Sequence, residues 1–247
     1  MSRRRSRAKV RRLRRMAVRF SVFAAFLLFF LLFFRLKTVI VSGSVHLKPD
    51  EVTRILLERP SAENTLLTKL FNTNRTLNRE GFVERIDTQI LGRDKLRVIV
   101  EERKFVGCVE AGGAYWYFDS SGRVYAKAPK RTKGEPIPLV EGLELRADPE
   151  VMFQLPVANT KAFSMLAMLR NFVDSDPGML PDSAVFEGSA MTLRYGKIDV
   201  LTGSGEKLEM RLRELSGVLP ELKSGYQGTL HLENYDGSQN GLIFDRK

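Results

Sequence analysis

The chain offers few residues of the types and spacing that catalysis or metal binding needs. It has two histidines, His46 and His231, and neither has a partner at i+4, the spacing that places two metal ligands on one helical face. No Gly-x-Ser-x-Gly nucleophile motif and no phosphate-binding loop pattern occurs. The single cysteine, Cys108, lies in an apolar run, cannot form an internal disulfide and is expected to be buried filler. The sequence therefore predicts a protein that is not an enzyme and needs no cofactor or metal.

The acidic residues that could be imagined as catalytic groups have ordinary interpretations. Asp119 falls in a Ser-Ser-Gly hairpin turn, where an aspartate commonly accepts hydrogen bonds from the turn backbone. Glu101 and Glu102 follow each other at the end of an expected strand, so we expect both carboxylates to be solvated. A cell-wall enzyme is kept only as a minor alternative.

Most of the excess positive charge is concentrated at the N-terminus. The formal net charge is +11, but residues 1–19 hold ten of the forty Lys and Arg residues and no acid, which leaves thirty basic against twenty-nine acidic residues elsewhere. No aromatic residue interleaves this run before residue 16, as a base-stacking surface would require. We therefore interpret the run as a cytoplasmic tail that sets topology and contacts anionic lipid. The basic residues nearest the apolar segment are Arg11, Arg12, Arg14, Arg15 and Arg19.

An apolar segment follows the basic tail. Residues 20–34 are uncharged and would span roughly 22 Å as a helix, and residues 16–36 span roughly 30 Å if the flanking arginines reach the head groups. A cleavable signal peptide is the main alternative, but residues 33–37 offer no small-x-small cleavage site. The pattern favours an uncleaved transmembrane helix over 16–36, with residues 1–19 inside and the rest outside the membrane.

A first extracytoplasmic domain is expected over 37–104. Residues 36–42 read as a strand, 49–60 as a helix, 79–86 as a short helix, and 87–91 and 95–101 as a strand pair, in the order β-α-α-β-β. Between the two helices we expect Leu66, Leu67, Leu70 and Phe71 to be buried.

A second domain is expected over 105–235, followed by a tail over 236–247. Strands are predicted at 106–110, 115–119, 123–126, 137–140, 184–187, 191–195, 198–201 and 229–232, with amphipathic helices at 160–173 and 206–223. The fold class is thus α+β, with a mixed or antiparallel sheet in the second domain and an exposed edge on its final strand.

The order of several short motifs resembles the FtsQ/DivIB family of bacterial cell-division proteins along nearly the whole chain. Residues 39–52 (VIVSGSVHLKPDEV) are similar to the opening of that family's POTRA domain, and residues 96–103 (LRVIVEER) to the strand that ends it. Residues 119–125 (DSSGRVY) resemble its Asp-x-x-Gly hairpin, and residues 195–196, 207–208 and 228–232 its closing section. The chain departs from the family pattern at Ser44, where Asn is usual, and at Phe105, where Pro is usual.

This resemblance implies a divisome scaffold in the inner membrane, enriched at the septum, with its outer domains extracytoplasmic. The implied partners are FtsL and FtsB/DivIC, together with components of the septal peptidoglycan synthase, and nucleic acid is not an expected partner. In the family the partner docks along the final strand and just after it, by addition of a strand. The matching contacts here are Leu230, Leu232, Tyr235, Ser238 and Phe244, with Arg211 and Arg213 facing acidic groups on the partner.

Two alternatives stay open for these residues and for the function. Leu230 and Leu232 can fill the core instead, while Arg211 and Arg213 face water. A protein of another class, a membrane-tethered nucleic-acid- or lipid-binding protein, would act through the Arg-rich tail.

Overall fold

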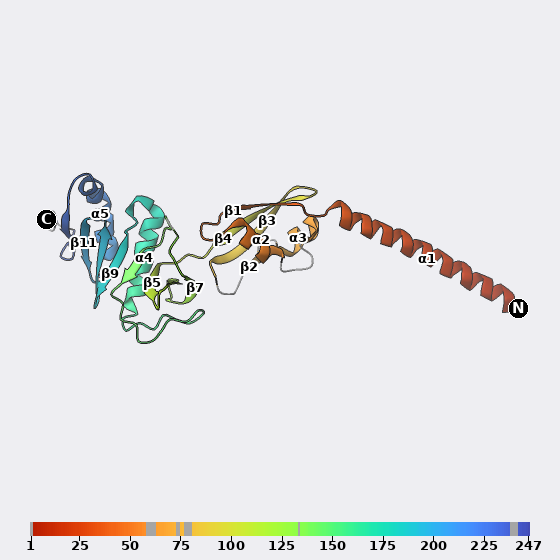
Figure 1. Ribbon diagram of the computed structural model, residues 1–247, viewed down its shortest axis with the longest axis horizontal. Helices are drawn as coiled ribbons and strands as arrows, with labels where there is room; N and C mark the ends of the chain where they lie inside the picture. The colour runs from red at the N-terminus through yellow and green to blue at the C-terminus, as the bar shows by residue number, and fades with distance from the viewer. Residues whose placement is uncertain (1, 58–62, 73–74, 77–80, 133, 238–241) are drawn as a thin grey trace. The chain divides into compact units, whose positions relative to one another are not determined.

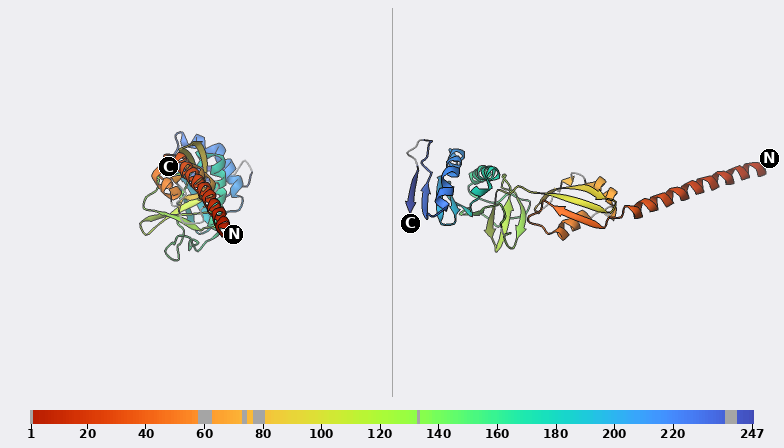
Figure 2. Two further views of the ribbon diagram at one scale, coloured as in Figure 1. Left: turned by 90° about the vertical axis from the view of Figure 1, so that its right-hand side faces the viewer. Right: turned by 90° about the horizontal axis from the view of Figure 1, so that it is seen from above.

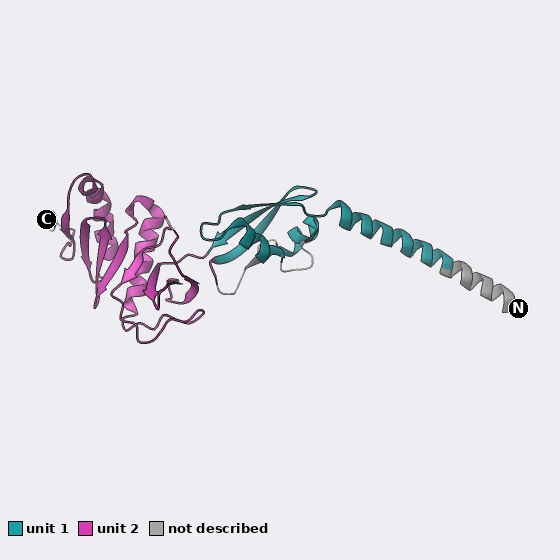
Figure 3. Cartoon of the chain, viewed as in Figure 1, with its two compact units in different colours: residues 1–77, 83–102 teal, residues 78–82, 103–247 magenta. Residues whose placement is uncertain are grey.

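The computed structural model describes residues 2–57, 63–72, 75–76, 81–132, 134–237 and 242–247. The chain divides into two compact units, shown in different colours in Figure 3. Unit 1 comprises residues 1–77 and 83–102, and unit 2 comprises residues 78–82 and 103–247. Each contains both helices and strands, so the fold is α+β, as the sequence predicts.

The N-terminal segment is one long helix, α1 (Ser2–Phe33), which Figure 1 shows as unbroken. Within the described residues, one helical stretch, Arg14–Phe33, is long and apolar enough to cross a membrane by length and composition. None of this stretch is buried, so its apolar side chains are largely exposed, although the Phe33 ring at its end contacts the Arg93 guanidinium. This is what a helix exposed to lipid needs, because a core helix would cover those side chains.

The rest of unit 1 is a small sheet with two helices. The elements are β1 (Thr38–Ser42), α2 (Pro49–Leu57), α3 (Thr65–Asn72), β2 (Arg75–Thr76), β3 (Val83–Gly92) and β4 (Lys95–Glu102). The strand order is β1-β4-β3-β2, with β1 parallel to β4 and the other pairs antiparallel. Helix α2 packs its apolar residues onto the sheet, because its i, i+4 spacing puts them on one face. The buried core consists of Val52, Leu56, Val83, Ile86, Leu96, Val98 and Val100.

The short helix predicted over 79–86 is wrong, because residues from 83 onward belong to β3. The pairing of β3 with β4 shifts register between Val83 and Arg85, which leaves Glu84 as an extra residue in a β-bulge. Val83 and Ile86 therefore face the core at a spacing of three, which imitates a helix in the sequence. The second helix of the unit is α3 instead.

Helix α3 also reverses the predicted burial of its side chains. Thr65, Thr68 and Asn72 form its buried face, whereas Leu70 is 70% and Phe71 49% exposed. The prediction that four apolar residues are buried here is therefore wrong for Leu70 and Phe71, whereas Leu66 and Leu67 are half-buried. This arrangement is unusual for a helix in contact with water, where the polar residues normally face outward.

Glu102, at the end of β4, closes the connection between β1 and α2. Its Oε1 accepts hydrogen bonds from the Ser44 hydroxyl at 2.9 Å and from the backbone amides of Val45 and His46 at 2.7 and 2.9 Å. Its Oε2 lies 2.6 Å from His46 Nδ1, and the carboxylate side chain is only 13% exposed. Burial alone would raise the pKa of Glu102, but these hydrogen bonds outweigh burial and lower the pKa to about 2. The expectation of a solvated carboxylate is therefore wrong for Glu102, whereas Glu101 is exposed and pairs with Arg85.

Unit 2 contains nine strands and two long helices among its described residues. Its elements are β5 (Gly107–Ala111), β6 (Ala114–Phe118), β7 (Val124–Ala128), β8 (Leu139–Glu141), α4 (Lys161–Ser175), the 3₁₀ turn η2 (Pro177–Met179), β9 (Ser183–Glu187), β10 (Ala190–Tyr195), β11 (Ile198–Gly203), α5 (Leu208–Lys223), β12 (Gly228–His231) and β13 (Ile243–Arg246). Each predicted strand and helix of the second domain is present to within a few residues. Strand β13 is an addition that the sequence did not indicate.

The strands of unit 2 form one mixed sheet in the order β13-β12-β11-β10-β9-β8-β5-β6-β7. The pairs β11–β12, β8–β9 and β5–β8 are parallel, and the other neighbours are antiparallel. Figure 2 shows the same strands and the helices α4 and α5 in two further views. Both helices contribute to a single apolar core with the strands, because Leu166 and Leu169 of α4 and Leu212 and Leu215 of α5 are almost fully buried.

Candidate partner-binding surface

The predicted exposed edge on β12 is covered by the chain's own last residues. Strand β13 pairs antiparallel with β12, with His231 opposite Ile243 and Leu230 opposite Phe244. The prediction that the strand near 229–232 ends the sheet is therefore wrong. The open edge at this end of the sheet belongs to β13, which has one strand neighbour among the described residues.

The backbone directions in β13 follow from the hydrogen bonds around it. The Lys247 amide donates to the Gln227 carbonyl, while the amides of Gly228 and Leu232 donate to residues 197 and 201 on the β11 side. Backbone groups alternate direction along a strand, so residues 243 and 245 turn theirs toward β12. The amides and carbonyls of Phe244 and Arg246 consequently point away from β12, where an added strand would meet them.

The side chains at this edge form a small aromatic and charged cluster. The rings of Tyr226 and Phe244 meet edge to face at 6.1 Å, and the Arg246 guanidinium lies 4.3 Å from the centre of the Tyr226 ring. Ile243 is 58% exposed and Tyr226 40% exposed. Tyr226 was not predicted as a site residue, because it precedes β12 and approaches β13 only through the pairing of the two strands.

His231 adds a charged network on the same strand pair. Its Nδ1 lies 2.8 Å from Glu233 Oε1 and its Nε2 lies 3.2 Å from Asp245 Oδ2. The hydrogen bond to Glu233 is the main cause that raises the pKa of His231 above its ordinary value. The imidazolium therefore links β12 to β13 more strongly as the pH falls.

Several predicted contact residues are buried in unit 2. Leu230 and Leu232 are 1% and 0% exposed, which corresponds to the core alternative. Tyr235 is 9% exposed, and its hydroxyl donates to Glu214 Oε2 at 3.0 Å. These three side chains hold β12 and the segment after it onto the core, so they position the edge rather than form its surface.

The two arginines of α5 have different environments. Arg211 is 7% exposed and donates to the carbonyls of Thr202, Ser204 and Tyr235, with the shortest of these bonds 2.7 Å long. Arg213 is exposed and pairs with Glu209 one turn away. The expectations that Arg211 faces a partner or faces water are both wrong. Its donors tie α5 to the end of β11, to the residue after β11 and to the segment that follows β12.

The other predicted site residues are Ser238 and the arginines of α1. Ser238 lies outside the described residues. Arg14, Arg15 and Arg19 are exposed on α1, while Arg11 and Arg12 fall in the part of α1 whose side chains are not described.

Three further groups of unit 2, Glu135, Cys108 and Asp119, are buried or hydrogen-bonded within the unit. Glu135 accepts from the Tyr117 hydroxyl at 2.9 Å and from Arg131 Nε at 2.5 Å. Cys108 is fully buried, as predicted, and burial raises its pKa to about 12, so the thiol is protonated at neutral pH. Asp119 Oδ1 accepts from the amides of Ser121 and Arg123, which is the turn role that was predicted. Within the described ranges, no group of three or more His, Cys, Asp or Glu side chains is placed to hold a metal ion.

The other end of the nine-stranded sheet is less open than the β13 end. Strand β7 exchanges backbone hydrogen bonds with the loop beside it, because Val124 donates to Phe153 and accepts from Met152. Tyr125 also accepts from the Gly81 amide. A strand that adds to this sheet would therefore find free backbone groups at β13 more readily than at β7.

The fold and this edge define an α+β protein with a candidate membrane-spanning helix and an open strand at the end of its larger sheet. In comparisons with known proteins, no protein-family model matches the chain and no curated protein matches it. Its function must therefore be argued from the fold, the edge and the sequence resemblance.

Proposed function

We propose that this protein is a single-pass membrane scaffold of the FtsQ/DivIB type that binds other cell-division proteins at the β13 edge. Its N-terminus would lie in the cytoplasm and units 1 and 2 outside, because the basic residues are concentrated before the apolar stretch of α1. Unit 1 would correspond to a POTRA domain and unit 2 to the family's C-terminal β domain. The partners would be FtsL and FtsB/DivIC, and the complex would help to control septal peptidoglycan synthesis without a catalytic step of its own.

The observation that carries the proposal is the edge of β13. The outward amides and carbonyls of Phe244 and Arg246 form a backbone template to which an extended partner segment can add. The exposed Ile243 and the Tyr226–Phe244 pair supply apolar contact beside it. Backbone pairing would give affinity, and the side chains beside it would give selectivity.

Two substitutions at Arg246 test whether the partner pairs with the backbone of β13. Arg246→Pro removes an outward amide from β13, whereas Arg246→Ala removes the same side chain and keeps that amide. The full chain in detergent micelles is mixed with the outer segments of FtsL- and FtsB/DivIC-type proteins and captured on beads. We expect Arg246→Ala to retain binding and Arg246→Pro to lose most of it.

A second variant separates addition to β13 from replacement of β13. Phe244→Ala removes the ring that packs on Tyr226 and so loosens β13. Weaker binding supports addition to β13, because the template is then less ordered. Stronger binding would mean that the partner displaces β13, and would place the true site on β12.

The basic tail is tested separately from the edge. Replacing the arginines of residues 3–15 by neutral residues, with insertion verified, should leave partner capture unchanged. Loss of function in cells despite correct insertion would instead favour a protein that acts on lipid or nucleic acid through its tail. A hydrolysis assay on purified peptidoglycan tests the minor enzymatic alternative.

A further inference from the structure

Two segments of unit 1 are hydrogen-bonded to the end of α1. The Asn64 side chain donates to the carbonyls of Phe30 and Leu31, both at 3.4 Å, and the Thr65 amide donates to the Phe34 carbonyl at 2.8 Å. The Leu31 carbonyl is among those that a helix leaves unsatisfied at its C-terminus, and the Phe30 carbonyl also accepts from the Phe34 amide. The start of α3 is thereby held at the point where the chain leaves the apolar stretch.

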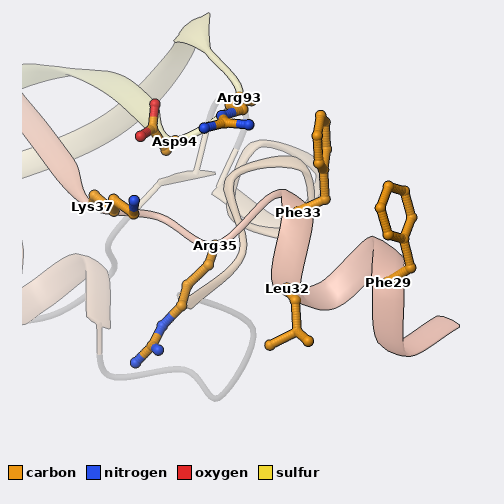
Figure 4. Close-up of a pocket in the computed structure, with 7 residues that line it drawn as sticks. All are labelled: Phe29, Leu32, Phe33, Arg35, Lys37, Arg93 and Asp94. Atoms are coloured by element: carbon orange, nitrogen blue, oxygen red, sulfur yellow. The ribbon is translucent and has the colours of Figure 1, made fainter. Parts of the chain in front are cut away.

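The turn between β3 and β4 is held at the same point. The carbonyl of Asp94 accepts from the amides of Lys37 and Thr38 at 2.9 and 3.1 Å. Figure 4 shows Arg93 beside Phe33, and the guanidinium lies 5.2 Å from the centre of that ring. Arg35, Lys37 and the carboxylate of Asp94 line the same hollow, so three basic groups and one acid lie at the end of the apolar stretch.

Both segments carry exposed apolar side chains that unit 1 does not cover. On α3 these are Leu70 and Phe71, 70% and 49% exposed. At the end of β3 they are Ile90 and Leu91, 43% and 44% exposed. An outward apolar face is costly in water, so its presence on two segments held at one place calls for an apolar environment there.

The length of α3 limits how far its apolar residues lie from the end of α1. Phe71 lies six positions after Thr65, which is a rise of roughly 9 Å along the helix axis. The polar region of a bilayer is about 5–8 Å thick on each side, and interfacial helices bury their apolar faces about 5–10 Å into it. Leu70 and Phe71 are thus within reach of the boundary between head groups and acyl chains.

We propose that unit 1 docks onto the outer surface of the phospholipid bilayer through Leu70, Phe71, Ile90 and Leu91. This inference rests on one part of the proposed function, that α1 spans the membrane. The bilayer is the occupant because hydrogen bonds hold the start of α3 and the β3–β4 turn at the point where the chain leaves the exposed apolar stretch of α1. The basic side chains of Arg35, Lys37 and Arg93 lie at the same point, where lipid phosphates would be. The sheet and the two short helices of unit 1 then lie against the membrane surface, instead of being connected to it only by a flexible linker.

Tryptophan fluorescence with brominated lipid tests the docking. Trp116 is the only tryptophan, so Trp116→Phe gives a background without signal. Phe71→Trp in this background is reconstituted as the full chain into phosphatidylethanolamine–phosphatidylglycerol vesicles whose acyl chains carry bromine near the head group. We expect a blue-shifted emission and a large loss of intensity relative to unbrominated vesicles.

Two further tryptophans serve as matched controls. Val45 is 56% exposed and lies beyond the end of β1 that is farther from α1. Strand β1 is about 13 Å long from Thr38 to Ser42, so residue 45 is far from the lipid. Val45→Trp should therefore show neither a blue-shifted emission nor quenching by bromine. Phe26→Trp lies within the apolar stretch and should be quenched, most strongly by bromine deep in the chains.

The outcomes separate this inference from the proposed function. If Phe26→Trp is quenched and Phe71→Trp behaves like Val45→Trp, α1 is inserted and the docking proposal is wrong. If Phe26→Trp is not quenched, the anchor itself is wrong and both proposals fail on that point. Quenching at residue 71 but not at residue 45 supports docking, whatever the partner-capture experiments show.

Discussion

Replacing Glu102 by Gln should weaken unit 1, because Glu102 accepts four hydrogen bonds from the turn that connects β1 to α2. Its two oxygens accept from the Ser44 hydroxyl, the Val45 and His46 amides and the His46 ring. A glutamine side chain has the same shape but only one acceptor oxygen and no charge. Its NH₂ group would face donors in the position where the second carboxylate oxygen of Glu102 accepts hydrogen bonds. The buried donors left without a partner then lower the free energy of unfolding.

The magnitude follows from the pKa of the carboxylate. A folded pKa of about 2 against an ordinary value of 4.5 corresponds to a stabilisation of roughly 3 kcal/mol at neutral pH. Because glutamine keeps part of the hydrogen bonding, we expect Glu102→Gln to cost about 2 kcal/mol. The folded pKa is depressed, so this stabilisation is fully present above pH 4.5 and is lost as the pH falls toward 2.

Hydrogen exchange measured by mass spectrometry on the full chain in micelles can locate the effect. Peptides from β1 and β4 should exchange about 30-fold faster in Glu102→Gln than in the wild type at pH 7, whereas peptides from unit 2 should not change. The ratio of variant to wild type cancels the intrinsic chemical rate at each pH. This ratio should shrink toward one between pH 4.5 and pH 2.

Glu101→Gln is the matched control, since its carboxylate is half exposed and pairs with Arg85 on the surface. It should change exchange by less than about threefold. Equal effects of the two substitutions, or a Glu102→Gln effect that persists unchanged near pH 2, would refute the reasoning that the buried charge stabilises this turn.

Three further substitutions test other contacts. Arg211→Met should cost unit 2 about 2–3 kcal/mol, because it strands buried carbonyls, while Arg213→Ala should cost less than about 0.5 kcal/mol; urea unfolding followed by Trp116 fluorescence measures both. Asn64→Ala should speed amide exchange in α3 by an amount equivalent to about 1 kcal/mol, because Oδ1 caps its first amides, and Asn64→Asp should retain that cap. Gly142→Ala should cost roughly 2 kcal/mol or more in the same urea assay, because φ is +76° and a Cβ would lie 2.1 Å from a backbone oxygen.

The elements of unit 2 could be predicted because their signals are local. In β4 of unit 1 as well, Leu96, Val98 and Val100 alternate with exposed residues, and each hairpin turn carries glycine or aspartate at the required position. The helices α4 and α5 show leucine and methionine spacing over three or more turns. Such patterns depend on neighbours within a few residues, which a sequence displays directly.

The errors arose where the deciding contact is distant in the sequence. The bulge at Glu84 depends on β4, and the role of Glu102 depends on a turn more than fifty residues earlier. Strand β13 has two apolar and two charged residues, and only its pairing with β12 makes it a strand. The burial of Arg211 follows from three carbonyls on other segments, which no local pattern around α5 indicates.

The sign of the Phe244→Ala experiment follows from the energetics of the β13 pairing. A partner that displaces β13 must first break the backbone bonds of β13 to β12, the Tyr226–Phe244 contact and the His231–Asp245 contact. Such a partner binds only the molecules in which β13 is open. Its apparent affinity is therefore low in proportion to the small population of that open state. A partner that adds to β13 breaks none of these and instead requires β13 to be ordered. Loosening the strand therefore raises affinity in the first mechanism and lowers it in the second. Because His231 and Asp245 join the two strands more firmly when His231 is protonated, a mildly acidic pH should move affinity in the opposite direction to Phe244→Ala under either mechanism.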